Sequence, residues 1–296
     1  MTSLLQIRPF FDEATKTVTY LVWDAATLDG AVIDPVLDYD PASGRVSALS
    51  VERVLSAAKR EGVRIVWTLE THIHADHLSG ARLIKAATGA KIGAGKHIVD
   101  VQRTFRPVFN ADDLEPDGRD FDALFFDGQL LPLGGLEIEV LYTPGHTAAD
   151  VSFVIEDAVF VGDTVFMPDY GTARTDFPGG DAHRLYSSIR RLLDLPSSTR
   201  MFMCHDYKAP GRDSYAWSTT VAEERARNVH IHDGVTEAQF VALRQARDAE
   251  LAAPALLLPS IQVNIRAGRL PPEQTNGARY LLSPVKAAAD TLNAMV

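Results

Sequence analysis

A cluster of histidines that follows directly after a short apolar run is the feature that most constrains how this chain can fold. Residues 63–69 are rich in β-branched and aromatic side chains, which is typical of a buried strand. The run leads into His72-Ile73-His74-Ala75-Asp76-His77, which holds three imidazoles and one carboxylate within six residues. A solvated polar loop would not explain why so apolar a strand precedes the cluster. We therefore expect a buried strand that ends at a loop of potential metal ligands.

Three later residues that are able to bind a metal also follow predicted strands. His146, Asp163 and His205 each stand a few residues beyond an apolar run. In α/β folds the loops at strand ends are where sites are assembled, because a rigid sheet positions their side chains. The strand candidates in this part of the chain are residues 136–142, 151–155, 159–161 and 201–203.

The rest of the chain predicts alternating strands and helices. Residues 105–127 are rich in Asp and Pro and are expected to form a long surface excursion. We expect one catalytic domain over residues 1–233. Residues 234–296 form an extension with too few apolar residues for a core of its own, so it should pack on the main domain and should be irregular around its prolines. Further expected strands are 17–23 and 31–35, paired as an antiparallel hairpin, and 91–94; expected helices are 51–60, 78–88, 182–193 and 237–251.

Charge and cysteine content exclude several kinds of protein. The formal net charge of −10 argues against a general nucleic-acid or anionic-membrane binder, because either would usually need a basic face. A single cysteine, Cys204, allows no intramolecular disulfide and no all-cysteine metal site, and an inert buried thiol is expected there rather than a nucleophile. No apolar run is long enough to span a bilayer. We expect a cytoplasmic protein without membrane or nucleic-acid partners, and a homodimer remains open.

The candidate ligands are imidazoles and carboxylates, which suit zinc, iron or manganese. Seven donors exceed what one ion needs. Either two metals share the set with Asp163 as the bridge, or one metal takes a subset and the other residues surround it. The spacing of the residues leaves both arrangements open. The candidates are His72, His74, Asp76, His77, His146, Asp163 and His205.

The order of these motifs resembles that of the metallo-β-lactamase superfamily over roughly residues 6–230. The matching segments are residues 71–77, residues 143–147, Gly162-Asp163 and His205. The resemblance implies an α/β (α+β) fold, a four-layered αβ/βα sandwich with the metal at one edge. This superfamily includes glyoxalase II, lactonases, β-lactamases, nucleases and iron-dependent persulfide dioxygenases.

Further segments are similar to the persulfide dioxygenases and to a bacterial β-lactamase-hydrolase-like subgroup associated with sulfide detoxification. Met203-Cys204 before His205 departs from the pattern, since small residues are usual there. The similar segments are Thr172-Ala173-Arg174-Thr175-Asp176-Phe177, His205-Asp206-Tyr207, Glu223-Glu224-Arg225 with Asn228, residues 169–174, and Ile261-Gln262-Val263-Asn264-Ile265-Arg266-Ala267-Gly268 in the tail.

This resemblance implies one Fe(2+) per chain held by His72, His146 and Asp163. Two histidines and one carboxylate leave three coordination positions open, which suits an iron that holds both O2 and a substrate sulfur. The implied reaction oxidises glutathione persulfide, or a related small persulfide, with O2 and water to sulfite and thiol. The remaining candidate ligands, His74, Asp76, His77 and His205, would orient the iron ligands and handle protons.

Two residues are candidate substrate contacts. Arg174 is expected to anchor a carboxylate of glutathione, because guanidinium pairs with carboxylates through two hydrogen bonds; a structural ion pair with Asp176 or Asp169 is the alternative. Tyr207 is expected to line the thiol-binding pocket, with simple packing as its alternative.

The competing hypothesis is a dinuclear hydrolase with two Zn(2+), such as a glyoxalase II-type thioesterase. A hydroxide that bridges the metals would attack a polarised carbonyl. The complete seven-residue set favours this hydrolase, whereas the Arg174 segment and the tail favour the dioxygenase. A binding or scaffold protein without catalysis would predict damaged ligands, and none of the seven is missing.

Overall fold

Two six-stranded sheets form the centre of the protein, in a computed structural model that describes residues 4–285. Residues 286–296 of the expected extension lie outside the described part. In the first sheet the order is β1-β2-β3-β6-β8-β9, and β2 is buried along its whole length. The expected hairpin of β2 and β3 is antiparallel, as predicted. The strands are β1 (Leu5–Asp12), β2 (Thr17–Asp24), β3 (Asp29–Ile33), β6 (Arg64–Leu69), β8 (Lys91–Gly95) and β9 (Ala123–Phe125).

The second sheet has the order β10-β11-β12-β13-β14-β15. Its β13 and β14 are parallel, and so are β3 and β6 in the first sheet, so the loops that follow each pair lie at one edge. The strands are β10 (Leu130–Leu133), β11 (Leu136–Tyr142), β12 (Val151–Ile155), β13 (Ala158–Phe160), β14 (Arg200–Phe202) and β15 (Ser218–Thr220).

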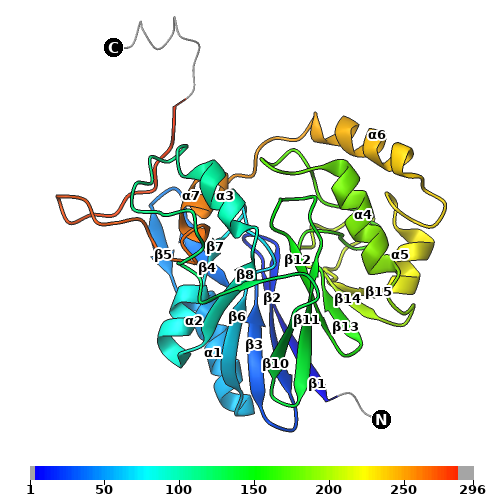
Figure 1. The fold of residues 1–296 in the computed structure, drawn as a ribbon, viewed down its shortest axis with the longest axis horizontal. Coiled ribbons are helices and arrows are strands. Elements are labelled where there is room, and N and C mark those ends of the chain that lie inside the picture. Colours follow the sequence, from blue (N-terminus) through cyan, green and yellow to red (C-terminus); the bar gives the residue numbers. More distant parts are fainter. Residues whose placement is uncertain (1–3, 286–296) are drawn as a thin grey trace, which may run out of the picture.

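The two sheets pack face to face, with helices on the outer face of each (Figure 1). One cluster of buried side chains, including Val22 and Leu69 of the first sheet and Phe153 and Phe160 of the second, fills the space between them. Helix α1 (Leu49–Glu61) covers the outer face of the first sheet and α4 (Ala182–Leu193) that of the second. This arrangement confirms the expected four-layered αβ/βα sandwich.

The predicted helix over residues 78–88 begins later than expected. Leu78–Ser79 is a short strand, β7, that pairs with β4 (Val36–Asp40), and β5 (Arg45–Ser47) completes this three-stranded sheet. Helix α2 starts only at Ala81 and ends at Thr88. The apolar residue Leu78 fitted a helical pattern, but a backbone partner from β4 takes precedence over local propensity.

The expectation that residues 105–127 form a surface excursion is wrong. Helix α3 (Ile98–Phe105) precedes the segment, and β9 within it belongs to the first sheet. Phe109, Leu114 and Phe121 are buried in a cluster that also contains residues of the C-terminal helix α7 (Leu257–Asn264). The Asp and Pro content concealed these apolar residues because they follow neither a helical nor a strand period.

The C-terminal part of the described chain is more regular than expected. Helix α6 (Glu237–Asp248) ends three residues before its predicted end, and α7 occupies a stretch that the prolines predicted to be irregular. Pro259 is tolerated because it lies in the first turn of α7, where backbone N–H groups need no helical partner. Gln102 joins the two regions, since its amide donates to the carbonyl of Ile265 at 2.8 Å.

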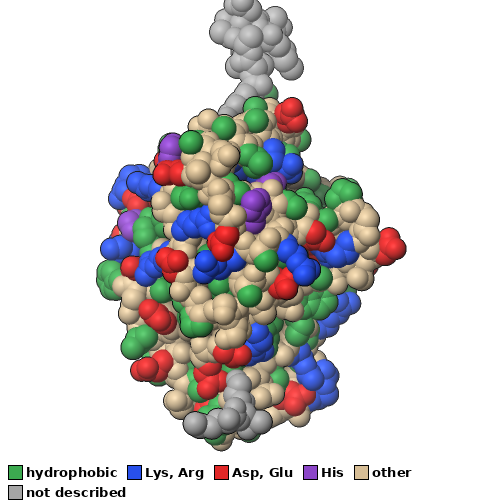
Figure 2. All heavy atoms as spheres, turned by 90° about the vertical axis from the view of Figure 1, so that its right-hand side faces the viewer, with side chains coloured by type: hydrophobic (Ala, Val, Ile, Leu, Met, Phe, Trp, Pro, Cys, Tyr) green, Lys and Arg blue, Asp and Glu red, His purple; other side chains and the backbone are tan. Residues whose placement is uncertain are grey.

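The face formed by α4, α5 (Val221–Arg227) and α6 carries interspersed acidic and basic side chains (Figure 2). Several of these are ion pairs, such as Arg225 with Asp233 at 3.0 Å. Over residues 4–285, every helix is too short or too polar to cross a bilayer.

Because only part of the 105–127 segment is buried, two side-chain substitutions within it should change the free energy of unfolding by different amounts. Leu114→Ala should lower the free energy of unfolding by about 2–5 kcal/mol, because Leu114 is fully buried. Val108→Ala should change it by no more than about 0.5 kcal/mol, because Val108 is 41% exposed. Urea unfolding of both variants measures the difference. Equal effects would contradict the packing described here.

Candidate metal centre

The side chain of His72 is fixed by the loops that follow β3 and β6. Asp34, just after β3, accepts hydrogen bonds from the backbone N–H of Thr71 at 2.8 Å and from its hydroxyl at 2.9 Å. The same hydroxyl contacts Nδ1 of His72 at 3.0 Å. Nε2 of His72 is buried and has no hydrogen-bond partner in the described structure. An unpaired buried imidazole nitrogen of this kind is what a metal ligand requires.

His146 is held from the opposite sheet. It follows β11 in a loop where the ideal Cβ of a residue at Gly145 would overlap the backbone of Leu185, and Gly145 has φ of 146°. Nδ1 of His146 lies 2.9 Å from the carbonyl oxygen of Arg174. Because a carbonyl only accepts, Nδ1 carries the proton and Nε2 keeps its lone pair. This is the tautomer that binds a metal through Nε2.

Asp163, which follows β13, completes a group of three. Its Oδ2 lies 3.8 Å from Nε2 of His72 and 3.7 Å from Nε2 of His146. The ligand atoms of these three residues all lie within 4.8 Å of one another. Burial lowers the pKa of His72 well below its ordinary value, so its imidazole is neutral. Two imidazoles and one carboxylate that converge on one point fit a divalent cation.

The other oxygen of Asp163 faces a second group. Nε2 of His205 lies 3.3 Å from Oδ1 of Asp163 and 3.3 Å from Oδ2 of Asp76. Nδ1 of His77 lies 3.6 Å from the same oxygen of Asp76. The structure therefore brings together all seven residues that the sequence indicated, and Asp163 stands between the two halves.

His74 differs from its neighbours because two buried carboxylates surround it. Its Nε2 lies 3.1 Å from Asp34 and 3.4 Å from Glu70. Burial alone lowers the pKa of His74, but the charge and hydrogen bonds of Asp34 and Glu70 outweigh it and raise the pKa well above its ordinary value. The two carboxylates therefore favour the protonated imidazolium form of His74.

Asp34 and Glu70 were not among the candidates from the sequence. Asp34 lay inside the predicted strand 31–35, whereas the structure ends β3 at Ile33 and so places Asp34 just after a strand, as it does Asp163. Glu70 directly follows the strand before the cluster. Cys204 is buried, and burial raises the pKa of its thiol well above the ordinary value. It is a protonated thiol at neutral pH, which makes it a poor nucleophile.

The metal group opens into a cavity of about 430 Å³ that is also lined by Tyr207, Arg174 and Arg247. The ring of Tyr207 stacks on that of His205, with centroids 5.6 Å apart. Arg174 forms the ion pair with Asp176 that the sequence left open, through two hydrogen bonds of 2.6 Å. Its third contact is the carbonyl oxygen of Ala252 at 2.7 Å. Arg247, by contrast, is exposed and makes no side-chain hydrogen bond or ion pair with the described residues.

The segment that carries Arg174 is supported from behind by buried polar groups. Asn228 donates to the carbonyl of Gly171 at 3.1 Å and to Glu224 at 2.6 Å. Burial raises the pKa of Glu224 to about 8, so this carboxyl is neutral at pH 7. The Glu-Glu-Arg and Asn motifs of the sequence thus support a loop of the cavity.

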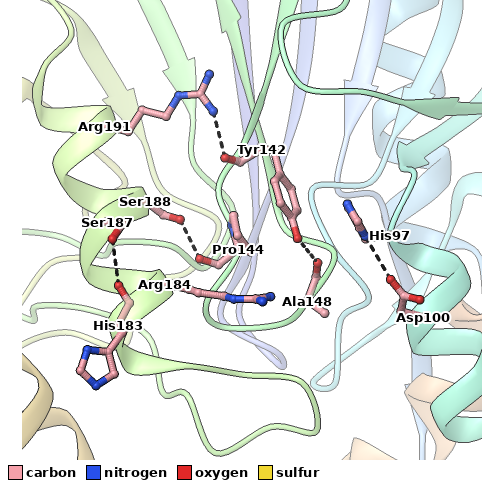
Figure 3. Close-up of a pocket in the computed structure, with 10 residues that line it drawn as sticks. All are labelled: His97, Asp100, Tyr142, Pro144, Ala148, His183, Arg184, Ser187, Ser188 and Arg191. Atoms are coloured by element: carbon pink, nitrogen blue, oxygen red, sulfur yellow. Dashed lines mark hydrogen bonds and ion pairs between the residues drawn. The ribbon is translucent and has the colours of Figure 1, made fainter.

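A second, larger concavity of about 720 Å³ lies between α3 and α4 (Figure 3). Its described lining residues include none of the seven candidate ligands. Ser188 donates to the carbonyl of Pro144 at 2.6 Å and Tyr142 donates to that of Ala148 at 2.9 Å. These bonds hold the chain on both sides of His146 from the outer face of its loop.

Comparison with known proteins agrees with this geometry. The sequence model of the Metallo-beta-lactamase superfamily matches residues 14–205. The chain is 50% identical to a probable metallo-hydrolase of Burkholderia pseudomallei, over 96% of this chain and 100% of that protein. It is 44% identical to glyoxylase B2 of Dictyostelium discoideum, over 96% and 98%. It is 45% identical to a beta-lactamase hydrolase-like protein of Xylella fastidiosa over 95% of this chain, and it spans only 65% of the length of that relative.

Similarity to the persulfide dioxygenases is lower in sequence and clear in structure. The chain is 28% identical to the mitochondrial persulfide dioxygenase ETHE1 of Homo sapiens, over 76% of this chain and 75% of that protein. The crystal structure of ETHE1 from Myxococcus xanthus superposes with a TM-score of 0.71 at 29% identity, covering 89% of this chain and 100% of that one. With its sandwich fold, its ligand cluster and these matches, the chain belongs to the metallo-β-lactamase superfamily.

Proposed function

We propose that this chain is an iron-dependent persulfide dioxygenase that oxidises glutathione persulfide, or a related small persulfide, with O2 to sulfite and thiol in sulfide detoxification. The observation that carries the proposal is the convergence of His72, His146 and Asp163 on one point at the cavity, while His74 is paired with carboxylates instead. Two imidazoles and one carboxylate are the ligand set of non-haem Fe(II) oxygenases.

The state of His74 supports one metal rather than two. A second metal site needs more neutral donors, but Asp34 and Glu70 face Nε2 of His74 and raise its pKa, which disfavours the neutral imidazole. The buried Nδ1 of His74 has no hydrogen-bond partner among the described residues. Deprotonating His74 would leave the carboxylates of Asp34 and Glu70 buried without their counter-charge, which is unfavourable. His74 therefore contributes by orienting its loop rather than by binding the ion.

The residues around the proposed iron site would handle the protons that the reaction releases. Glutathione persulfide, O2 and water give glutathione, sulfite and two protons, which balances atoms and charge. When bound, Fe(2+) supplies redox chemistry and open coordination positions for O2 and sulfur. His205 lies 3.3 Å from Asp163 and 3.3 Å from Asp76 and is the group placed to receive the released protons. Tyr207 covers His205 and restricts water.

The charges around the cavity support an anionic substrate. Glutathione carries two carboxylates, and a cavity of about 430 Å³ is in the usual range for small ligands. Three of the five N–H donors of Arg174 bond Asp176 and Ala252, so a substrate carboxylate must compete with both for the guanidinium. Arg247 lines the same cavity with its donors free among the described residues. We propose Arg247 as the main carboxylate contact, with Arg174 assisting after it exchanges partners.

A dinuclear zinc hydrolase, such as a glyoxalase II-type thioesterase, is the second candidate. It is favoured by Asp163, whose two oxygens face two groups of donors, as a bridging ligand requires. The relatives named metallo-hydrolase and glyoxylase, at 50% and 44% identity, favour it as well. The dioxygenase remains the stronger candidate because of the pairing of His74.

Metal content and oxygen uptake separate the two candidates. Protein purified without added metal should contain about one iron per chain and should consume O2 when glutathione persulfide is added, because one ion satisfies the three convergent donors. Elemental analysis and an oxygen electrode measure both quantities. Two zinc ions per chain, no oxygen uptake and hydrolysis of S-lactoylglutathione would establish the hydrolase instead.

Ligand variants test the assignment of single residues. His146→Ala should lose at least about 90% of its iron, because it removes one of three direct ligands. His74→Gln should keep near-normal iron, since its amide still donates to Asp34. Iron is measured after anaerobic reconstitution and gel filtration. The opposite pattern, with iron lost from the His74 variant alone, would overturn the mononuclear assignment.

Arg247→Ala should raise KM for glutathione persulfide by about tenfold and change kcat little, because a charged hydrogen bond to the substrate is lost in both the ground and transition states. Steady-state oxygen uptake measures both constants. Arg227→Ala is the matched control, since Arg227 is exposed on α5 and pairs with Glu223. An unchanged KM in Arg247→Ala would exclude Arg247 as the anchor.

A further inference from the structure

We infer that the C-terminal helix α7 is part of the metal centre, with Asn264 as the positioning residue of the His72–His77 loop. The inference goes beyond the proposed chemistry, because it applies to iron and zinc alike. It rests only on the metal centre at His72, His146 and Asp163.

The side chain of Asn264 makes three hydrogen bonds to the chain around the ligands. Its Nδ2 donates to the carbonyl of His74 at 2.8 Å and to that of His77 at 2.8 Å. Its Oδ1 accepts from the backbone N–H of Ser79 at 2.8 Å. Asn264 is 3% exposed, so water cannot readily replace these bonds. One amide thus joins the middle of the ligand loop, its end and the last residue of β7.

The loop needs such a partner because it has left its strand. Between the end of β6 and the start of β7, the carbonyls of His74 and His77 lie outside the sheets. Buried carbonyls of this kind must find donors elsewhere. Asparagine offers two donors and one acceptor on a short, stiff side chain, which matches the two carbonyls and one N–H here.

The contacts of Asn264 continue to the ligands through the loop backbone. His74 and His77 are the two residues whose carbonyls are held, and Asp76 lies between them. The hydroxyl of Ser79 donates to Glu70, and Glu70 in turn contacts Nε2 of His74. A change at Asn264 therefore alters both the backbone of the ligand loop and the carboxylate that faces His74. Mutation of residues that orient metal ligands typically lowers metal affinity by about 10- to 100-fold.

Helix α6 supports the opposite side of the centre, because its side chains bond the segment that carries Arg174. Asp248 accepts from the N–H of Thr175 at 2.8 Å and from its hydroxyl at 2.9 Å, and Arg244 donates to the carbonyl of Thr172 at 3.0 Å. Arg174 lies between Thr172 and Thr175 in the sequence, and its carbonyl accepts a hydrogen bond from Nδ1 of His146. The two C-terminal helices thus support the centre from both sides.

The test compares two amides on the same helix. Gln262 is 2% exposed, and its amide bonds the carbonyls of Leu258 at 2.8 Å and Leu282 at 2.9 Å without contacting the ligand loop. Asn264→Leu and Gln262→Leu therefore remove similar buried amides, but only the amide of Asn264 bonds the His72–His77 loop. Co(2+) is the probe, because its visible absorption reports the geometry of its ligands.

Asn264→Leu should raise the Kd of the metal-free protein for Co(2+) by roughly 10- to 100-fold and alter the visible spectrum. Gln262→Leu should lower Tm to a similar extent and keep the wild-type Kd and spectrum. Asn264→Ala, which creates less strain, provides the same readout if the leucine variant fails to fold.

A wild-type Kd in a folded Asn264 variant would overturn the inference. An equal loss of Co(2+) affinity in Gln262→Leu would also overturn it, because the effect would then be general destabilisation. If the wild-type protein binds no Co(2+), the metal centre itself is refuted. Failure of oxygen uptake alone, with Co(2+) affinity lost only in the Asn264 variants, would refute the dioxygenase and leave the role of Asn264 supported.

Discussion

The buried carboxylate of Asp34 is the interaction on which the rest of the metal centre depends. It accepts two hydrogen bonds from Thr71, which contacts His72, and it contacts Nε2 of His74. A buried charge is stable only if it is paired and hydrogen-bonded, and Asp34 has both kinds of partner. Because β3 and β6 are parallel neighbours, the fold brings Asp34 to Thr71 without any long loop. The scaffold and the centre are therefore joined at one side chain.

Asp163 has the corresponding role for the second sheet. Its oxygens point to different donor groups, so the same backbone can hold one ion or two. One of the neighbouring imidazoles, that of His74, is itself paired with Asp34 and Glu70, which lie beyond the candidate ligands.

Much of the centre could be predicted from the sequence because its ligands follow strands. The apolar run of β6 and the His and Asp residues after β11, β13 and β14 gave local signals, and the sheet edge brought them together. Leu78–Ser79 was misassigned because its partner, β4, is remote in sequence. Phe109 and Leu114 were read as surface residues because their burial depends on α7. Asn264 lies in a segment that resembles the β-lactamase-hydrolase-like subgroup. Its contact with His74, 190 residues earlier, could not be predicted, because no periodic pattern of residues indicates so distant a partner.

The distance along the chain between Asn264 and the ligand loop has a consequence for the order of assembly. Asn264 follows His74 by 190 residues. At ribosomal rates of about 5–20 residues per second, roughly 10–40 s pass between the synthesis of the two. During that interval the loop carbonyls lack their donor, while the imidazoles of His72, His74 and His77 are already present. Productive loading with metal therefore belongs to the completed chain, and a nascent chain would offer the ion only a looser and less selective set of ligands.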